Sequence, residues 1–123
     1  MTNEPLTIFH NPSCSKSREA LQILEQHKTQ PKVIEYLDTP PSQSDIRQIA
    51  KKLGVAPIDL FRTTEKSYVD AGYQADLMTD EEIIEAIAKH PSLLQRPIVI
   101  YGNKAIIGRP PIKVLDIIPS LQV

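Results

Sequence analysis

Cys14 is the single cysteine in this chain of 123 residues, and its setting is that of a reactive thiol. It follows a short run of β-prone residues and precedes an amphipathic segment, which predicts a turn between a strand and a helix. At the start of a helix, unpaired backbone N–H groups and the helix dipole stabilise an anion. Both favour thiolate over thiol, so we expect a lowered pKa and a nucleophilic role for Cys14.

Four neighbours of Cys14 would support this chemistry. His10 would stabilise the thiolate if it were protonated, or it would orient the loop. Ser17 is predicted to donate a hydrogen bond from its hydroxyl to the sulfur, and Lys16 and Arg18 add positive charge. Two other histidines, His27 and His90, are expected only to interact with the ends of helices.

The residue spacing excludes several other kinds of cysteine site. The motif is C-x-x-S, so the chain has no dithiol redox pair. Ala20 stands where a cysteine-phosphatase loop has its arginine, and the common glycine-rich phosphate motifs are absent. With one cysteine, the chain can form neither an internal disulfide nor a cysteine-based zinc site. The electrons for any reduction must therefore come from an external thiol.

Composition excludes other classes of partner. The formal net charge is −1, which gives no overall attraction to nucleic acid. No apolar run approaches the 18 or so residues of a membrane span, and residues 1–5 do not resemble a signal peptide. We therefore expect a cytoplasmic protein of one domain, with no bound metal and no membrane or nucleic-acid partner.

The element order predicts an α/β protein. Residues 6–9 and 32–37 are expected to form strands around a helix over 15–27, which Ser13 or Ser15 would cap. Residues 42–90 are expected to form a helical insertion. A capping box is predicted at the start of its first long helix, from Ser42 and Asp45, and Gly54 is expected to end that helix. A second capping box is predicted at its last long helix, from Thr79 and Glu82. Short helices are expected between them, at residues 57–61 and 67–71. The buried faces of the two long helices are predicted to be Ile46, Ile49, Ala50 and Leu53, and Ile83, Ile84, Ile87 and Ala88.

The C-terminal part predicts a hairpin and a last helix. Residues 97–101 and 104–107 would pair across a Gly102-Asn103 turn. A helix would follow Pro110-Pro111, with Ile112, Leu115 and Ile118 facing the core. The order β-α-β, helical insertion, β-β-α is that of a thioredoxin/glutaredoxin-like fold with a mixed sheet.

Four segments resemble the motifs of one known family. The loop His10–Arg18 resembles the active-site loop of the glutaredoxin-coupled arsenate reductases. The segments Leu60-Phe61-Arg62, Arg96-Pro97-Ile98-Val99 and Gly108-Arg109-Pro110 resemble the family's three arginine segments, in family order. The resemblance as a whole spans residues 6–118. Plasmid-encoded members have a longer C-terminal tail, so the chain is more similar to the short chromosomal type.

The resemblance implies a role for each matching residue. Cys14 corresponds to the nucleophile, His10 and Ser17 to residues that lower its pKa, and Pro97 to a cis-proline beside the site. The residues implied to bind arsenate and arsenite are Arg62, Arg96 and Arg109. Guanidinium groups suit this role because they stay charged and bind tetrahedral oxyanions through paired hydrogen bonds.

The implied reaction is the reduction of arsenate to arsenite, and the implied biological role is arsenic detoxification. Cys14 would attack arsenic(V), glutathione would act as co-substrate, and glutaredoxin would resolve the resulting mixed disulfide. The implied protein holds no bound cofactor, and we expect a monomer.

Two other functions remain open on the sequence. A monothiol, glutaredoxin-like oxidoreductase that removes glutathione from proteins would use Cys14 and Pro97 but would not need three arginines. A redox-regulatory adaptor that binds RNA polymerase would share the fold. Such regulators usually carry C-x-x-C, and Ser17 argues against a disulfide switch.

Overall fold

The computed structural model describes residues 6–27 and 29–117, which form two compact units. The first contains the described parts of Met1–Thr39 and Arg96–Val123, and the second is Pro40–Gln95. Cys14, Arg96 and Arg109 lie in the first unit, and Arg62 lies in the second.

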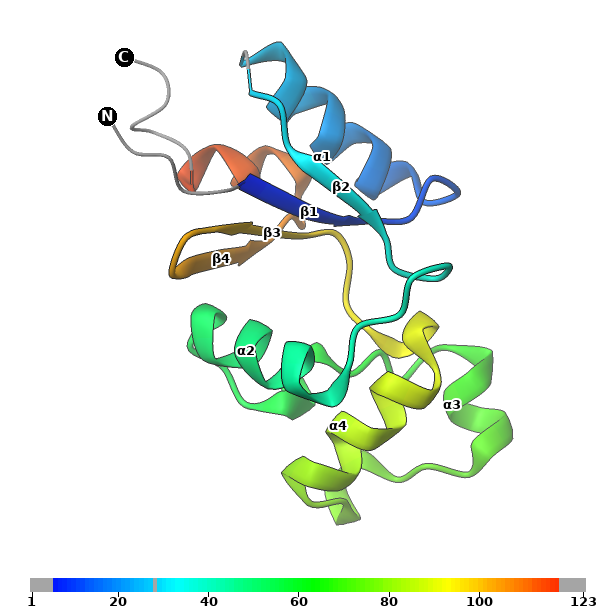
Figure 1. The fold of residues 1–123 in the computed structure, drawn as a ribbon. Helices are drawn as coiled ribbons and strands as arrows, with labels where there is room; N and C mark the ends of the chain where they lie inside the picture. Colours follow the sequence, from blue (N-terminus) through cyan, green and yellow to red (C-terminus); the bar gives the residue numbers. More distant parts are fainter. Residues whose placement is uncertain (1–5, 28, 118–123) are drawn as a thin grey trace. The chain divides into compact units, whose positions relative to one another are not determined.

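The first unit is built on a four-stranded mixed sheet in the order β2-β1-β3-β4 (Figure 1). β1 pairs with β2 in parallel, whereas the β1–β3 and β3–β4 pairs are antiparallel, as the sequence predicts. The strands are β1 (Leu6–His10), β2 (Lys32–Glu35), β3 (Ile98–Tyr101) and β4 (Lys104–Ile107). Gly102 turns the chain between β3 and β4 with a φ of 60°, a conformation that glycine adopts without steric cost.

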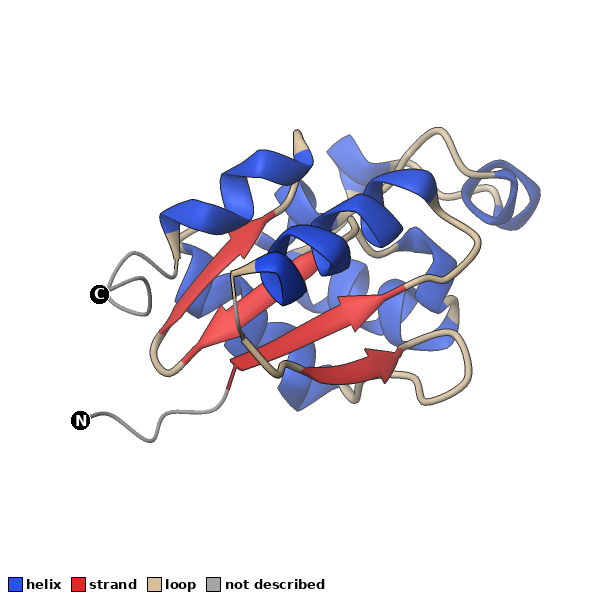
Figure 2. Ribbon diagram, turned by 90° about the horizontal axis from the view of Figure 1, so that it is seen from above, coloured by secondary structure: helices blue, strands red, loops and turns tan. Residues whose placement is uncertain are grey.

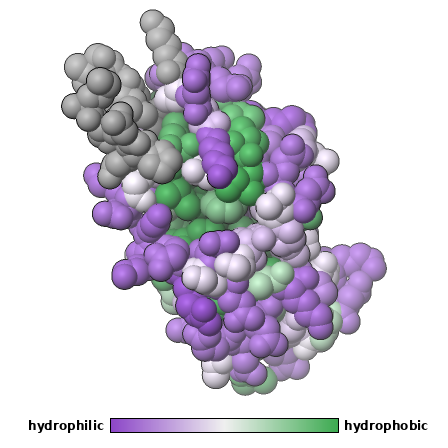
Figure 3. Space-filling model, in the orientation of Figure 1, coloured by the Kyte–Doolittle hydropathy of each residue, from purple (hydrophilic) through white to green (hydrophobic). Residues whose placement is uncertain are grey.

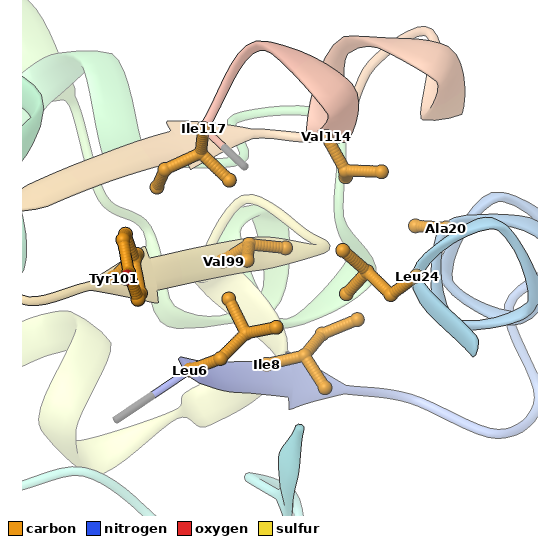
Figure 4. Close-up of a cluster of buried hydrophobic side chains, with 8 residues drawn as sticks. All are labelled: Leu6, Ile8, Ala20, Leu24, Val99, Tyr101, Val114 and Ile117. Carbon is orange, nitrogen blue, oxygen red and sulfur yellow. The ribbon is translucent and has the colours of Figure 1, made fainter. Parts of the chain in front are cut away.

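Two helices cover one face of this sheet (Figures 1 and 2). α1 (Ser15–Gln26) connects β1 to β2, and the 3₁₀ helix η4 (Pro111–Asp116) packs beside α1. Eight buried side chains from β1, α1, β3 and η4 form the core here (Figure 4): Leu6, Ile8, Ala20, Leu24, Val99, Tyr101, Val114 and Ile117. This core packs α1 against β1.

The last helix differs from the prediction. It is a 3₁₀ helix with three residues per turn, so every third side chain faces the core. Val114 and Ile117 are buried, and Leu115 packs at the edge of the core. The predicted burial of Ile112 is wrong, since this side chain is 56% exposed. Ile118 lies outside the described residues.

Two further expectations for the first unit are corrected. β2 ends at Glu35, two residues earlier than predicted, because residues 36–39 turn the chain away from the sheet. Neither Ser13 nor Ser15 caps α1, because the N-cap residue is Cys14 itself.

β2 is an edge strand, and Val33 on it is 42% exposed. Figure 3 shows apolar surface over the strands of this unit.

The second unit is helical. Its elements are α2 (Gln43–Leu53), η1 (Pro57–Leu60), α3 (Lys66–Ala71), η2 (Ala75–Leu77), α4 (Asp80–Lys89) and η3 (Pro91–Leu93). Both predicted capping boxes are confirmed, at Ser42 with Asp45 and at Thr79 with Glu82. Gly54 ends α2 with a φ of 71°.

The long helices α2 and α4 pack against each other inside this unit. The predicted buried faces are largely confirmed, but Leu53 and Ala88 are only half-buried. In α4, Ala86 is buried in place of Ala88. The short helices η2 and η3 were not predicted. Among the described helices, none is long and apolar enough to cross a bilayer.

Gly108 is expected to tolerate no side chain. A Cβ atom there would lie 2.9 Å from Cγ of Pro97 and 3.0 Å from Cγ1 of Val114. Gly108→Ala should therefore lower the free energy of unfolding by about 1–3 kcal/mol in urea denaturation. Gly54→Ala is the comparison, because its Cβ meets nothing within 4 Å and only the positive φ opposes it, at about 1 kcal/mol. An unchanged stability of Gly108→Ala would contradict the close packing.

Candidate active site

The loop between β1 and α1 is held by its own hydrogen bonds. The Cys14 N–H donates to the Asn11 carbonyl at 2.9 Å, and the Ser13 N–H donates to Oδ1 of Asn11 at 3.0 Å. The Cys14 carbonyl accepts the first helical hydrogen bond, from the Arg18 N–H at 3.0 Å. The Arg18 guanidinium closes the loop on the outside by donating to the Pro12 carbonyl at 2.8 Å. Cys14 is therefore fixed at the N-cap of α1, as its sequence position predicts.

The pKa of Cys14 is lowered by the groups around its sulfur. Burial raises the pKa of the thiol, but the Ser17 N–H, the Arg96 guanidinium and the Lys16 N–H outweigh burial and bring it below its ordinary value. The sulfur makes no close capping hydrogen bond to the helix. The backbone N–H groups of Ser17 and Lys16 therefore act on it from nearby, as the unpaired donors at the N-terminus of α1. Nη2 of Arg109 lies 3.9 Å from Sγ of Cys14. The thiolate thus lies between the helix N-terminus and two arginines.

The Ser17 hydroxyl has a different role from the one predicted. Its Oγ lies 2.7 Å from Nδ1 of His10 and accepts the Asn11 N–H at 3.0 Å. Ser17 is fully buried, so its hydroxyl is committed to these two partners. The effect of Ser17 on the sulfur comes from its backbone N–H. The hydroxyl instead ties the last residue of β1 to the first turn of α1.

His10 fits the second of its two predicted roles. Burial lowers the pKa of His10, and the charge of Arg18 lowers it further, against the opposing effects of Glu35 and Glu25. A lowered pKa favours the neutral imidazole at pH 7, which argues against His10 as a source of positive charge for the thiolate. Its 2.7 Å hydrogen bond to Ser17 orients the loop.

Arg96 and Arg109 form a connected pair beside Cys14. Nε of Arg109 donates to the Arg96 carbonyl at 2.6 Å, which directs the rest of the guanidinium toward the sulfur. Both arginines precede a proline, and the peptide bonds Arg96–Pro97 and Arg109–Pro110 are cis. The prediction of a cis-proline at Pro97 is confirmed, whereas that at Pro110 was not anticipated.

Arg62 lies in the second unit, where the structure gives it local partners. Nη1 of Arg62 forms an ion pair with Oε1 of Glu65 at 2.9 Å. The backbone N–H of Arg62 donates to the Leu93 carbonyl at 2.8 Å. The side chain is 16% exposed. Its role in binding an anion stays a prediction.

Sequence reasoning missed Tyr36, which is fully buried and lies close enough to Cys14 for the thiolate charge to raise the pKa of its phenol. The pairing of β1 with β2 is the feature that places Tyr36 near Cys14. β1 and β2 are parallel, and His10 pairs with Glu35. Residues that directly follow both strands therefore meet at one edge of the sheet.

The described part of the chain contains no group of three or more His, Cys, Asp or Glu side chains that could hold a metal ion. The donors around Cys14 are instead N–H groups and guanidinium groups, which suit an anion.

A sequence model of the ArsC family matches residues 9–117. The chain belongs to the ArsC family. It is 43% identical over 106 residues to a protein of Neisseria meningitidis serogroup A named arsenate reductase, covering 85% of this chain and 91% of that one.

Two solved structures of ArsC-type proteins agree with the fold. A putative arsenate reductase from Yersinia pestis has a TM-score of 0.86 and 42% identity, covering 90% of this chain and 98% of that one. An arsenate reductase from Vibrio cholerae has a TM-score of 0.86 and 38% identity, covering 95% and 100%. The resemblance to arsenate reductases and the thioredoxin-like fold class are confirmed.

The Cys14 thiol should titrate below the ordinary value of about 8.5. We expect the ultraviolet absorbance of the thiolate, followed against pH, to have its midpoint below that value. Arg96→Gln should move the midpoint upward, because the guanidinium charge and hydrogen bond favour the thiolate. Arg47→Gln, which removes an exposed arginine paired with Glu81 in the second unit, should leave it unchanged. A wild-type midpoint at or above 8.5 would refute the activation of Cys14.

Proposed function

We propose that this ArsC protein reduces arsenate to arsenite, with Cys14 as the nucleophile, glutathione as the reductant and glutaredoxin as the partner that regenerates the thiol. The observation that carries the proposal is the convergence of a thiol of lowered pKa with two guanidinium groups. Arsenate near neutral pH carries about two negative charges. A thiolate can approach it only where positive groups offset the repulsion.

In the first step the Cys14 thiolate attacks arsenic(V). A sulfur–arsenic bond forms and an arsenic–oxygen bond breaks, and the departing hydroxide takes up one proton from solvent to leave as water. The arsenic keeps its oxidation state. Arg109 and Arg96 hold the arsenate oxygens, and we expect Arg62 to be the third arginine of this set.

In the second step glutathione reduces the arsenic. Its thiolate attacks the sulfur of Cys14, and the electron pair of the sulfur–arsenic bond passes to arsenic, which becomes trivalent and leaves as arsenite. Cys14 is left as a mixed disulfide with glutathione. Because the chain contains no second cysteine, an external thiolate must attack this disulfide and release Cys14.

Glutaredoxin fits this last step because it attacks glutathione mixed disulfides. The cytoplasm is the compartment in which glutathione stays reduced. We therefore propose that the protein acts there, as a monomer and without a bound cofactor.

The decisive test is arsenate-dependent oxidation of NADPH in the presence of glutathione, glutathione reductase and glutaredoxin. We expect turnover by the wild type and none by Cys14→Ser, because a serine hydroxyl is neither ionised nor able to form the disulfide. Omission of glutaredoxin should also stop turnover. Activity on a glutathione mixed disulfide without arsenate turnover would instead identify a monothiol oxidoreductase.

Arg96→Lys should raise the KM for arsenate at least tenfold, because lysine carries the charge but cannot make paired hydrogen bonds to two oxygens. The steady-state KM in the coupled assay is the measurement. Arg47→Lys is the matched control, since Arg47 pairs with Glu81 on the surface of the second unit. A KM of Arg96→Lys equal to that of the wild type would remove Arg96 from the substrate site.

A further inference from the structure

The side chain of Tyr36 ends in a hydroxyl that the protein fold leaves without a close partner. Tyr36 is 0% exposed, and no described atom lies in hydrogen-bonding geometry with its hydroxyl. A buried hydroxyl without a hydrogen bond destabilises the folded state, because it has lost its contacts with water. Nothing in the local fold requires that cost, since phenylalanine would fill the same space.

The position of Tyr36 in the sheet brings it to the reactive loop. It directly follows Glu35, the last residue of β2, and Glu35 pairs with His10, the last residue of β1. The two strands are parallel, and Figure 1 shows both arrows pointing the same way. Tyr36 therefore leaves the sheet at the edge where the segment Asn11–Cys14 leaves β1.

The electrostatic surroundings of Tyr36 identify the same site. Burial raises the pKa of its phenol, Arg96 opposes that rise, and the negative charge of Cys14 adds to it. Arg96 and Asn11 act on the hydroxyl from nearby but do not reach close hydrogen-bonding geometry. The phenol thus keeps its proton at neutral pH and is a neutral donor among charged groups.

We propose that the Tyr36 hydroxyl donates a hydrogen bond to an oxygen of the arsenate bound at Cys14. This inference rests on the proposed function, because it takes arsenate as the ligand. Arsenate has four oxygens, and the arginines supply charged donors for them. A neutral donor adds a directional contact to one oxygen without adding a further positive charge to the site. Tyr36 is in this sense a specificity-determining residue for a tetrahedral oxyanion.

Tyr36→Phe tests the proposal because it removes a single oxygen atom. We expect the KM for arsenate in the coupled assay to rise about ten- to hundredfold, the range for loss of a hydrogen bond to a charged group. The thermal unfolding midpoint of the free protein should stay the same or rise, because an unsatisfied buried hydroxyl is lost. The thiol titration of Cys14 should not move. Tyr101→Phe is the control, because Tyr101 pairs with Leu6 at the opposite end of β1.

Three results would overturn the proposal. The first is a rise in KM of less than fivefold. The second is a rise accompanied by a lower unfolding midpoint, which would show a packing role. The third is an upward shift in the thiol titration, which would show that the hydroxyl acts on the thiolate.

A binding measurement separates this proposal from the proposed function. Arsenate that binds the folded protein raises its unfolding midpoint, whether or not turnover follows. If the wild type shows no turnover but arsenate stabilises it more than it stabilises Tyr36→Phe, the function fails and the role of Tyr36 stands. If arsenate stabilises both proteins equally, the role of Tyr36 fails. If arsenate neither stabilises the wild type nor is turned over by it, both fail.

Discussion

The lowered pKa of Cys14 depends on its place as the N-cap residue of α1. Partial burial alone would raise the pKa of the thiol, and the N–H groups of Lys16 and Ser17 reverse this effect together with Arg96. Those N–H groups are available only because the first turn of a helix has no carbonyl partners for them. The strand-helix-strand unit exists in this form because α1 packs on the sheet through Ala20 and Leu24.

Rigidity and charge come from different parts of the chain. The buried pair of His10 and Ser17 fixes the loop through a 2.7 Å hydrogen bond. The positive charge comes from Arg96 and Arg109, the latter 95 residues away from Cys14 in sequence. Arg109 is held by the Arg96 carbonyl, so one contact orients the cation that faces the sulfur. This division lets a protein of net charge −1 build a strongly positive site at one atom.

The helical unit 40–95 has its own core and its own end signals. Capping boxes at Ser42 and Thr79 define where its two long helices begin, and glycine at position 54 ends the first of them. The unit carries Arg62, whose backbone is tied to Leu93 and whose side chain is paired with Glu65. These contacts fix the orientation of Arg62 within its own unit.

The sequence by itself determined the strands, the long helices, both capping boxes and the position of Cys14 at a helix start, because these follow from local residue patterns. Tertiary structure decided the rest. The 3₁₀ form of η4 leaves the apolar side chain of Ile112 exposed. The hydroxyl of Ser17 bonds to His10 instead of to the sulfur, and burial lowers the pKa of His10. Tyr36 reaches the site only through the pairing of β1 with β2. Each of these depends on burial or on neighbours distant in sequence, which the spacing of residues along one segment does not contain.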